Sequence, residues 1–268
     1  MDYHKELEIA ITAALSAGQK IMDVYENNNK IDFESKSDNS PLTIADKKSH
    51  NTIVKYLNKT NINIISEESS VPSFDKRKGW NKYWLIDPLD GTKEFIKRNG
   101  EFTVNIALMK KNKPHIGVVF CPVKKILYWN NSKMDVFKKE NGEEIKLNNR
   151  KSILESDDNL RVVVSRSHMN DETKTYVEKL KNPKLISCGS SLKFLYIADN
   201  KADVYPRFGP TMEWDTAAGS AIIKTSHSKI YDFSLKELKY GKKDFRNSSF
   251  IVCNENINED FLKLITNC

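Results

Sequence analysis

The sequence predicts an α/β protein built from two halves, and three observations lead to this prediction. The 268-residue chain is 39% hydrophobic and 10% aromatic, enough for a packed interior, which excludes a disordered chain. Helical periodicity is strongest in residues 5–59, whereas residues 101–147 alternate between apolar and polar side chains as strands do. From residue 160 onward strand-like and helix-like segments alternate, as in layered α/β folds.

The first half is expected to contain two helices and a sheet of hairpins. Residues 5–25 and 44–59 each place apolar side chains on one helical face. Two short apolar strands follow in NINIISEE and KYWLIDP. The long alternating segment that comes next is interrupted by turn-forming NKP at 112–114 and NG at 141–142, so it predicts hairpins.

A charged segment, NNRKSILESDDN, separates the two halves, and we place a domain boundary near residue 155. Residues 1–155 would form an N-terminal α+β domain and residues 156–268 a C-terminal α/β domain. The expected segments of the second half are RVVVSRS, a helix around ETKTYVEKLK, LISCGS, SLKFLYIADN, ADVYPRF, a helix TAAGSAIIKT and a final strand SSFIVCN.

Composition narrows the possible functions. No apolar run approaches the roughly 18 residues of a membrane span, and the charged start of the chain does not resemble a signal peptide, so we expect a soluble intracellular protein. The four cysteines form no CxxC pair, so neither a disulfide framework nor a zinc site is indicated. The net charge of +7 is spread along the chain, which favours a local anion site over a nucleic-acid-binding protein.

The stretch WLIDPLDGTKEF combines a buried strand with two carboxylates. Pro88 lacks a backbone donor and favours an extended Asp87, so the strand is expected to end there. Gly91 permits a tight turn, and Thr92 could cap a helix that begins with KEF. Asp87 and Asp90 would then project from a strand–turn–helix unit whose helix start favours phosphate. Capping and turn formation alone are the alternative role for both aspartates.

Two further acidic stretches favour a metal site. IISEESS ends an apolar strand on Glu67 and Glu68, and Asp215 in MEWDTAAGSAII starts a helix of small residues. Buried like charges are costly unless a cation neutralises them. Because these stretches contain oxygen ligands without histidine or cysteine, they suit Mg²⁺ better than zinc.

DPLDGTKEF, preceded by SEES and followed by EWDTAAG, resembles the lithium-sensitive, Mg²⁺-dependent phosphatases of the inositol monophosphatase superfamily over nearly the whole chain. Within that superfamily, VVVSRSH, GSSLKFLYIADNKADVYPRFGPT and the KEF after DGT are similar to the bacterial 3′(2′),5′-bisphosphate nucleotidases. The resemblance implies a five-layer α-β-α-β-α sandwich of the inositol monophosphatase and fructose-1,6-bisphosphatase type. The metal site would lie in the cleft between the two halves.

The resemblance also implies a ligand set for two or three Mg²⁺ ions per active site. Glu67, Asp87 and the backbone carbonyl of Leu89 would hold the first ion. Asp87 would bridge to the second ion, which Asp90 and Asp215 complete. Neighbouring side chains on an extended chain face opposite ways, so the other glutamate of the SEES stretch would stand behind the ligands.

Catalytic and substrate roles follow from the same resemblance. Glu67, Thr92 and Asp46 would be catalytic, with Asp46 hydrogen-bonded to the Thr92 hydroxyl that orients the attacking water. The scissile phosphate would meet the amides of Gly91 and Thr92. The implied substrate-binding residues are Glu67, Leu89, Asp90, Gly91, Thr92, Ser190, Ser191, Lys193, Arg207 and Asp215.

Arg166 and His168 are further candidates for the second phosphate, because arginine offers a planar fork for phosphate oxygens. Simple exposure to solvent is the alternative for such cations at strand ends. Trp214 and Phe208 could stack on a purine, yet core packing is the role expected for both.

The implied reaction is hydrolysis of the 3′-phosphate of adenosine 3′,5′-bisphosphate to AMP and phosphate, in the disposal of a by-product of sulfate activation and transfer. The 2′,5′ isomer and the sulfated analogue PAPS would be secondary substrates, and lithium would inhibit. Three alternatives stay open: an inositol monophosphatase, a basic nucleic-acid-binding protein and a catalytically silent nucleotide sensor. A nucleotide bisphosphate, not nucleic acid, is the expected partner. The protein would be a cytoplasmic monomer or homodimer, with peripheral attachment to the inner membrane as an alternative location.

Overall fold

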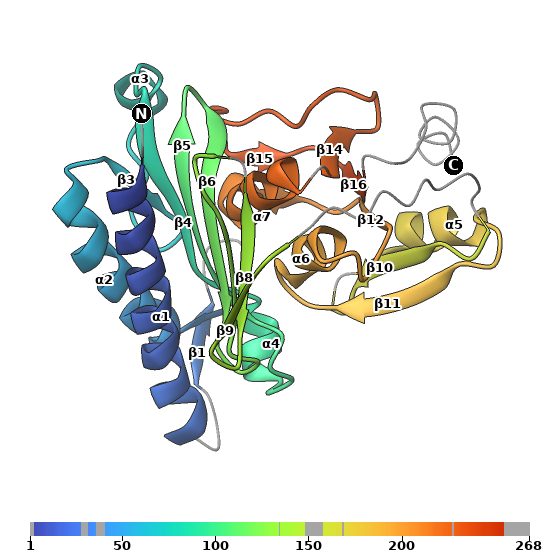
Figure 1. Ribbon diagram of the computed structural model, residues 1–268, viewed down its shortest axis with the longest axis horizontal. Coiled ribbons are helices and arrows are strands. Elements are labelled where there is room, and N and C mark those ends of the chain that lie inside the picture. The colour runs from blue at the N-terminus through green and yellow to red at the C-terminus, as the bar shows by residue number, and fades with distance from the viewer. Residues whose placement is uncertain are drawn as a thin grey trace.

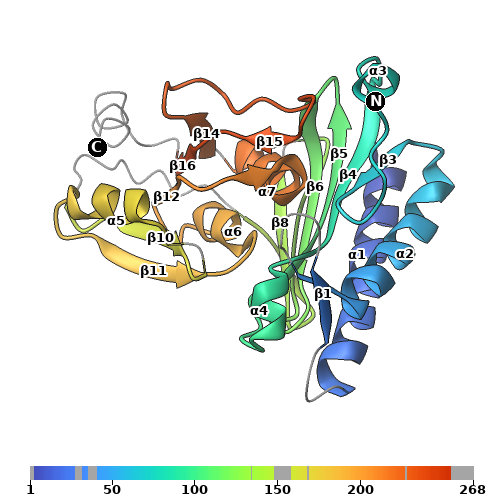
Figure 2. The ribbon, with the colours of Figure 1, turned by 180° about the vertical axis from the view of Figure 1, so that it is seen from behind.

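The computed structural model describes residues 3–27, 32–35, 41–133, 135–147, 158–167, 169–226 and 228–254. Its elements stack in five layers, as Figure 1 shows: a helix pair, a large sheet, a second helix pair, a smaller sheet and one outer helix. Figure 2 gives the same order of layers from behind. The predicted five-layer α-β-α-β-α sandwich is therefore confirmed.

The first layer consists of α1 (His4–Asn27) and α2 (Ile44–Leu57), which lie against one face of the large sheet. The buried face of α1 is largely alanine and glycine, so its backbone comes close to the sheet. A Cβ added at Gly18 would lie 2.3 Å from the ring of Phe120, which shows how tight this contact is. Both helices were predicted from their apolar periodicity.

The large sheet has seven strands in the order β3-β4-β5-β6-β7-β8-β9, and only β3 and β4 run parallel. Its strands are β3 (Ile64–Ser66), β4 (Lys82–Asp90), β5 (Thr103–Lys110), β6 (Lys113–Cys121), β7 (Ile126–Asn130), β8 (Val136–Glu140) and β9 (Glu143–Lys146). The predicted NG turn joins β8 to β9, with positive φ at Asn141 and Gly142. The turn expected at 112–114 instead uses Lys111 and Asn112, both at positive φ.

The central layer is made of α6 (Leu192–Ala198) and α7 (Glu213–Thr225). Although α7 comes from the second half of the chain, it packs on β5 and β6 of the first sheet. The small residues of its AAGSA stretch allow this close approach. Consequently one hydrophobic cluster contains side chains from both sheets, among them Leu85 and Val252.

The smaller sheet has the order β11-β10-β12-β16-β14, and α5 (Asp171–Glu178) covers its outer face. Its strands are β10 (Arg161–Ser165), β11 (Lys184–Cys188), β12 (Val204–Arg207), β14 (Ser228–Asp232) and β16 (Phe250–Asn254). Two-stranded ladders join β1 (Phe33–Ser35) to β2 (Pro41–Thr43) and β13 (Thr211–Met212) to β15 (Arg246–Asn247). The short helices are α3 (Phe74–Arg77), α4 (Thr92–Ile96) and the 3₁₀ turn η1 (Asn58–Thr60).

The expected domain boundary near residue 155 lies outside the described residues. The first sheet ends at Lys146, and the second begins at Arg161. Because α7 bridges the two sheets, the halves share a core. The division into residues 1–155 and 156–268 stays a prediction.

No helix within the described ranges is long and apolar enough to cross a membrane. Cys121, Cys188 and Cys253 are buried free thiols. Cys268 lies outside the described residues.

The contact between β6 and α7 can be tested at Gly117. A Cβ at this position would lie 2.2 Å from the carbonyl oxygen of Ala218, and neither backbone can yield easily. We expect Gly117→Ala to lower the free energy of unfolding by about 1–3 kcal/mol or more, as measured by urea denaturation. Gly79→Ala is the matched control, because nothing lies within 4 Å of a Cβ there. Equal stability of the two variants would contradict the tight packing of α7 on the sheet.

Candidate active site

A β-bulge in β4 places two aspartates on the same side of the sheet. Asp87 pairs with Asn105 of β5 and Asp90 pairs with Thr103, so three residue steps on β4 oppose two on β5. Side chains alternate along a strand, so two residues three steps apart would normally face opposite ways. The extra residue of the bulge removes that difference. Pro88, which has no amide hydrogen to donate, lies within the bulge.

The sequence-based expectation that β4 ends at Asp87 is therefore wrong, because the bulge absorbs Pro88 and the strand continues to Asp90. The expected cap was also misplaced. Gly91, at φ 91°, is the N-cap of α4, and Thr92 is its first helical residue. The left-handed conformation explains the glycine.

The Thr92 hydroxyl links this turn to α2. It lies 3.2 Å from Oδ1 of Asp46 and 3.2 Å from the carbonyl oxygen of Leu89, and its single proton can serve one of them at a time. Asp46 is only 1% exposed. Its Oδ2 accepts hydrogen bonds from the amide and hydroxyl of Thr43, which forms a capping box at the start of α2. These contacts fix the orientation of the carboxylate that faces Thr92.

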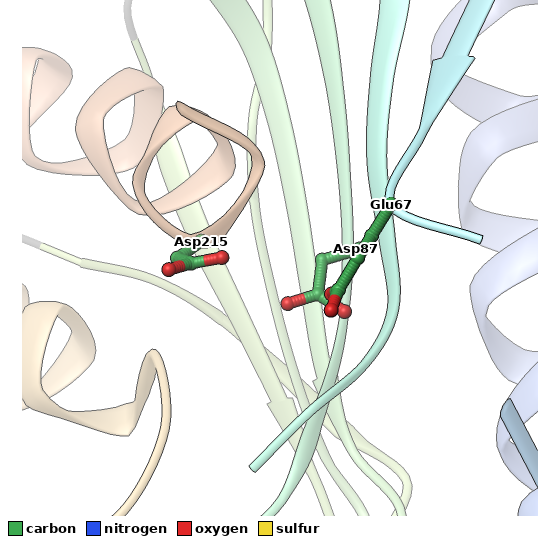
Figure 3. Close-up of side chains that lie close together, drawn as sticks. All are labelled: Glu67, Asp87 and Asp215. Atoms are coloured by element: carbon green, nitrogen blue, oxygen red, sulfur yellow. The ribbon is translucent and has the colours of Figure 1, made fainter. Parts of the chain in front are cut away.

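Three carboxylates from separate elements meet in one cluster. Glu67 follows β3, Asp87 lies in β4 and Asp215 lies in the first turn of α7. Each offers an oxygen atom, and these atoms all lie within 4.8 Å of one another. In Figure 3, Asp215 extends from the helix on one side toward Glu67 and Asp87 on the other. The structure thus brings one residue from each of the three acidic stretches close together, as the sequence analysis expected.

Electrostatic repulsion makes this cluster unfavourable by itself. Burial raises the pKa of Asp215 well above its usual range, and the negative charges of Asp90 and Glu67 raise the pKa further. The hydrogen bond from the amide of Met212 to Asp215 Oδ2, at 2.8 Å, acts in the opposite direction. A bound divalent cation would neutralise the cluster, and carboxylate oxygens without histidine or cysteine are the ligands that Mg²⁺ prefers.

Ser191 joins two of the acidic stretches. Its hydroxyl lies 2.8 Å from Oδ2 of Asp90 and 2.9 Å from the carbonyl oxygen of Asp215. Asn105 donates to the Ser191 hydroxyl at 2.8 Å and to Asp90 at 3.3 Å, while Thr103 donates to Asn105. Sequence reasoning missed Asn105 and Thr103. The available signal was the two polar side chains at alternate positions of the otherwise apolar strand TVNIALM.

A cleft of about 1040 Å³ contains the cluster, and its wall includes all the implied metal ligands and all the implied substrate-binding residues other than the further candidates Arg166 and His168. Asp46 is not part of the wall and reaches it through Thr92. Glu68, expected to stand behind the ligands, is also absent from the wall.

Two predicted cations in the wall are already hydrogen-bonded. Lys193 is buried and donates to the carbonyl oxygen of Ser190, and its burial lowers the pKa of the ammonium group. Arg207 donates to the carbonyl oxygens of Gly209 and Pro210, each at 3.2 Å. Both nevertheless line the cleft.

Arg166, a candidate for the second phosphate, does not lie in the cleft wall. Its guanidinium binds both oxygens of Glu101, at 2.6 and 2.9 Å, and the carbonyl oxygen of Ser187. Glu101 also accepts a hydrogen bond from the amide of Gly189, so this ion pair supports the loop before Ser190. His168 lies outside the described residues.

The two aromatic candidates pack against other rings. The Phe208 ring lies 4.5 Å from that of Phe233, and the Trp214 ring lies 5.4 Å from that of Phe245. Core packing was the expected role for both. Trp214 is also one of the residues that line the cleft.

The repulsion within the cluster predicts opposite effects of Asp215→Asn on stability and activity. The raised pKa means that an ionised Asp215 costs folding free energy at neutral pH, and this cost disappears as the pH falls through the raised pKa. An asparagine oxygen can still accept the Met212 hydrogen bond. Without metal the variant should therefore unfold at a higher temperature than the wild type, whereas phosphatase activity should fall more than about 100-fold.

Calorimetry of the chelator-treated proteins measures the first effect, and phosphate release measures the second. Asp171→Asn removes an exposed carboxylate elsewhere and should change neither. A metal-free Asp215→Asn protein that melts below the wild type would show that the cluster is not under electrostatic strain.

The position of Ser191 predicts an altered metal requirement. Ser191→Ala removes the hydrogen bond to Asp90, so the Mg²⁺ concentration for half-maximal activity should rise about 10- to 100-fold. Saturating Mg²⁺ should restore most of the maximal rate. Ser190→Ala is the matched control, because that hydroxyl contacts Thr103 and no carboxylate. Equal Mg²⁺ requirements in the two variants would argue against this role for Ser191.

Comparisons with known proteins agree with this geometry. The sequence pattern of the inositol monophosphatase family matches residues 2–268. The chain is 43% identical to the 3′(2′),5′-bisphosphate nucleotidase CysQ of Salmonella typhimurium, over 92% of this chain and 98% of that protein. The CysQ of Buchnera aphidicola is 41% identical, over 92% and 93%.

Solved structures give the same result. The crystal structure of CysQ from Bacteroides thetaiotaomicron superposes with a TM-score of 0.80 at 43% identity, covering 94% of this chain and 98% of that one. The inositol monophosphatase of Thermotoga maritima shares the fold, with a TM-score of 0.77 at 22% identity over 98% and 97% of the two chains. The chain therefore belongs to the inositol monophosphatase family.

Proposed function

We propose that this chain is a Mg²⁺-dependent 3′(2′),5′-bisphosphate nucleotidase, which hydrolyses the 3′-phosphate of adenosine 3′,5′-bisphosphate to AMP and phosphate. The observation that carries the proposal is the cluster of Glu67, Asp87 and Asp215 in a large cleft, in a chain 43% identical to a named bisphosphate nucleotidase. The 2′,5′ isomer and PAPS are proposed as secondary substrates.

The metal ligands in this proposal come from all three acidic stretches. Glu67, Asp87 and the carbonyl oxygen of Leu89 would hold one Mg²⁺, and Asp87, Asp90 and Asp215 a second. The all-oxygen donor set and the repulsion at Asp215 support this assignment. When bound, Mg²⁺ supplies Lewis acidity and lowers the pKa of its water toward neutrality. The proposal includes two or three ions per site.

Thr92 and Asp46 are proposed to orient the attacking water. When Thr92 donates its proton to Asp46, the oxygen lone pairs of Thr92 are left to accept a hydrogen bond from that water. The capping box at Thr43 holds Asp46 in place, so the direction of the Thr92 hydroxyl is set before substrate arrives. No described histidine lines the cleft, so the proposal assigns no histidine base.

Gly91 and Thr92 are proposed to bind the scissile phosphate through their backbone amides. The first backbone hydrogen bond of α4 runs from the amide of Phe95 to the carbonyl oxygen of Gly91. The amides of Gly91 and Thr92 lie before Phe95 in the chain. They therefore have no partner within the helix, and they lie in the wall of the cleft that contains the carboxylates. A phosphate there would be held between amide donors on one side and the metal ligands on the other.

The proposal also includes a small-molecule nucleotide as partner, a cytoplasmic location and a monomer or homodimer. Membership of the family and the relatives named above support the nucleotide substrate. The peripheral membrane attachment considered from the sequence receives no support from the described residues.

Phosphate release from purified protein tests the proposal directly. With Mg²⁺, turnover of adenosine 3′,5′-bisphosphate should exceed that of an inositol monophosphate by at least about tenfold in kcat/KM, which is within the discrimination that paired polar groups provide. Chelation should abolish the activity and added Mg²⁺ should restore it, while lithium should inhibit. Faster turnover of the inositol phosphate would refute the nucleotide assignment without affecting family membership.

A further inference from the structure

One cation of the cleft wall has a side chain without a partner. Lys93, Lys193, Arg207 and Arg246 line the cleft. The first three make interactions of their own, as described for Lys193 and Arg207. Arg246 is exposed, and within the described ranges its guanidinium makes no hydrogen bond or ion pair. Five N–H donors are therefore available at this point of the wall.

The backbone of Arg246 is tied to the segment that carries Asp215. In the β13–β15 ladder Arg246 pairs with Met212, and the amide of Glu213 donates to the carbonyl oxygen of Phe245 at 2.8 Å. The amide of Met212 in turn donates to the Asp215 carboxylate. Cross-strand partners lie about 5 Å apart, so the Arg246 backbone is within roughly 10 Å of the acidic cluster.

A buried glutamate holds the 241–247 loop that presents Arg246. Glu213 is completely buried, and its two carboxylate oxygens accept hydrogen bonds from the amides of Gly241 and Lys242. The ammonium group of Lys242 lies 2.9 Å from the same carboxylate. Burying a charge in this way is costly, and the hydrogen bonds offset the cost only in this conformation of the loop.

Two further buried side chains fix the same loop. Arg77, 5% exposed, donates to the carbonyl oxygens of Lys242 and Lys243 and lies 3.9 Å from the ring centroid of Phe245. Asn247, also 5% exposed, donates to the carbonyl oxygen of Met212 at 2.9 Å. None of these side chains has a part in the hydrolysis described above. Their shared effect is a rigid loop with Arg246 exposed at the cleft.

We propose that Arg246 binds the non-scissile 5′-phosphate of the substrate and so determines specificity for bisphosphates, an inference that rests on the proposed function. With the 3′-phosphate at the carboxylate cluster, the second phosphate needs a cation elsewhere in the cleft. A guanidinium matches a phosphate through two parallel hydrogen bonds. Asp244, the acidic neighbour in the wall, accepts a hydrogen bond from the Arg246 amide and so stabilises the turn.

Arg246→Met tests the assignment with two substrates. The KM for adenosine 3′,5′-bisphosphate should rise about 10- to 100-fold, the range expected for losing hydrogen bonds to a charged group, while kcat changes less than about threefold. The KM for adenosine 3′-monophosphate, which lacks the 5′-phosphate, should stay within about twofold. Inhibition by AMP, which keeps that phosphate, should weaken as much as bisphosphate binding.

Lys243→Met is the matched control, because it removes the same charge from the same loop at an exposed side chain outside the cleft wall. It should leave both KM values unchanged. Arg246→Lys, which keeps the charge and loses the planar fork, should give an intermediate KM for the bisphosphate.

The outcomes separate this inference from the proposed function. Wild-type activity on the bisphosphate combined with an unchanged KM in Arg246→Met overturns the assignment of Arg246 alone, as does an equal rise in KM for both substrates. A wild-type protein that does not hydrolyse the bisphosphate overturns the proposed function, and the role of Arg246 falls with it.

Discussion

The structure depends on holding carboxylates together against their mutual repulsion. Glu67 and Asp87 are fixed by the parallel pairing of β3 with β4, and Asp215 is fixed by the packing of α7 on the large sheet. Folding therefore brings carboxylate oxygens within 4.8 Å of one another, and apolar packing elsewhere offsets the cost of their repulsion. A bound cation would offset this cost, because it would neutralise the repulsion between the carboxylates.

The same constraint links the two halves of the chain. The cluster takes one carboxylate from β4, one from the residue that follows β3 and one from a helix that belongs to the second half of the chain. Ser191 adds a direct link, since its hydroxyl lies between Asp90 and the backbone of Asp215. Displacing α7 from the sheet would open the shared core and separate the three carboxylates at the same time.

The acidic stretches, the helices of the first layer and the five layers could be predicted from the sequence, because each rests on a local pattern or on resemblance to a family. The end of β4 could not, since a bulge that accommodates Pro88 depends on pairing with β5. The role of Arg166 was missed for a similar reason. Its partner Glu101 lies 65 residues away in the chain, and nothing local in SRSH indicates that pairing. Long-range partners, rather than local propensity, account for these errors.

The bulge in β4 also makes the length of the DPLD stretch more important than the residues between its aspartates. Inserting one further residue between the aspartates would leave them an odd number of register steps apart and turn one carboxylate toward the opposite, helix-covered face. Such a lengthened chain would keep all its acidic residues and still lose their arrangement. Across descendants of this protein, the number of residues between Asp87 and Asp90 should therefore not increase by one.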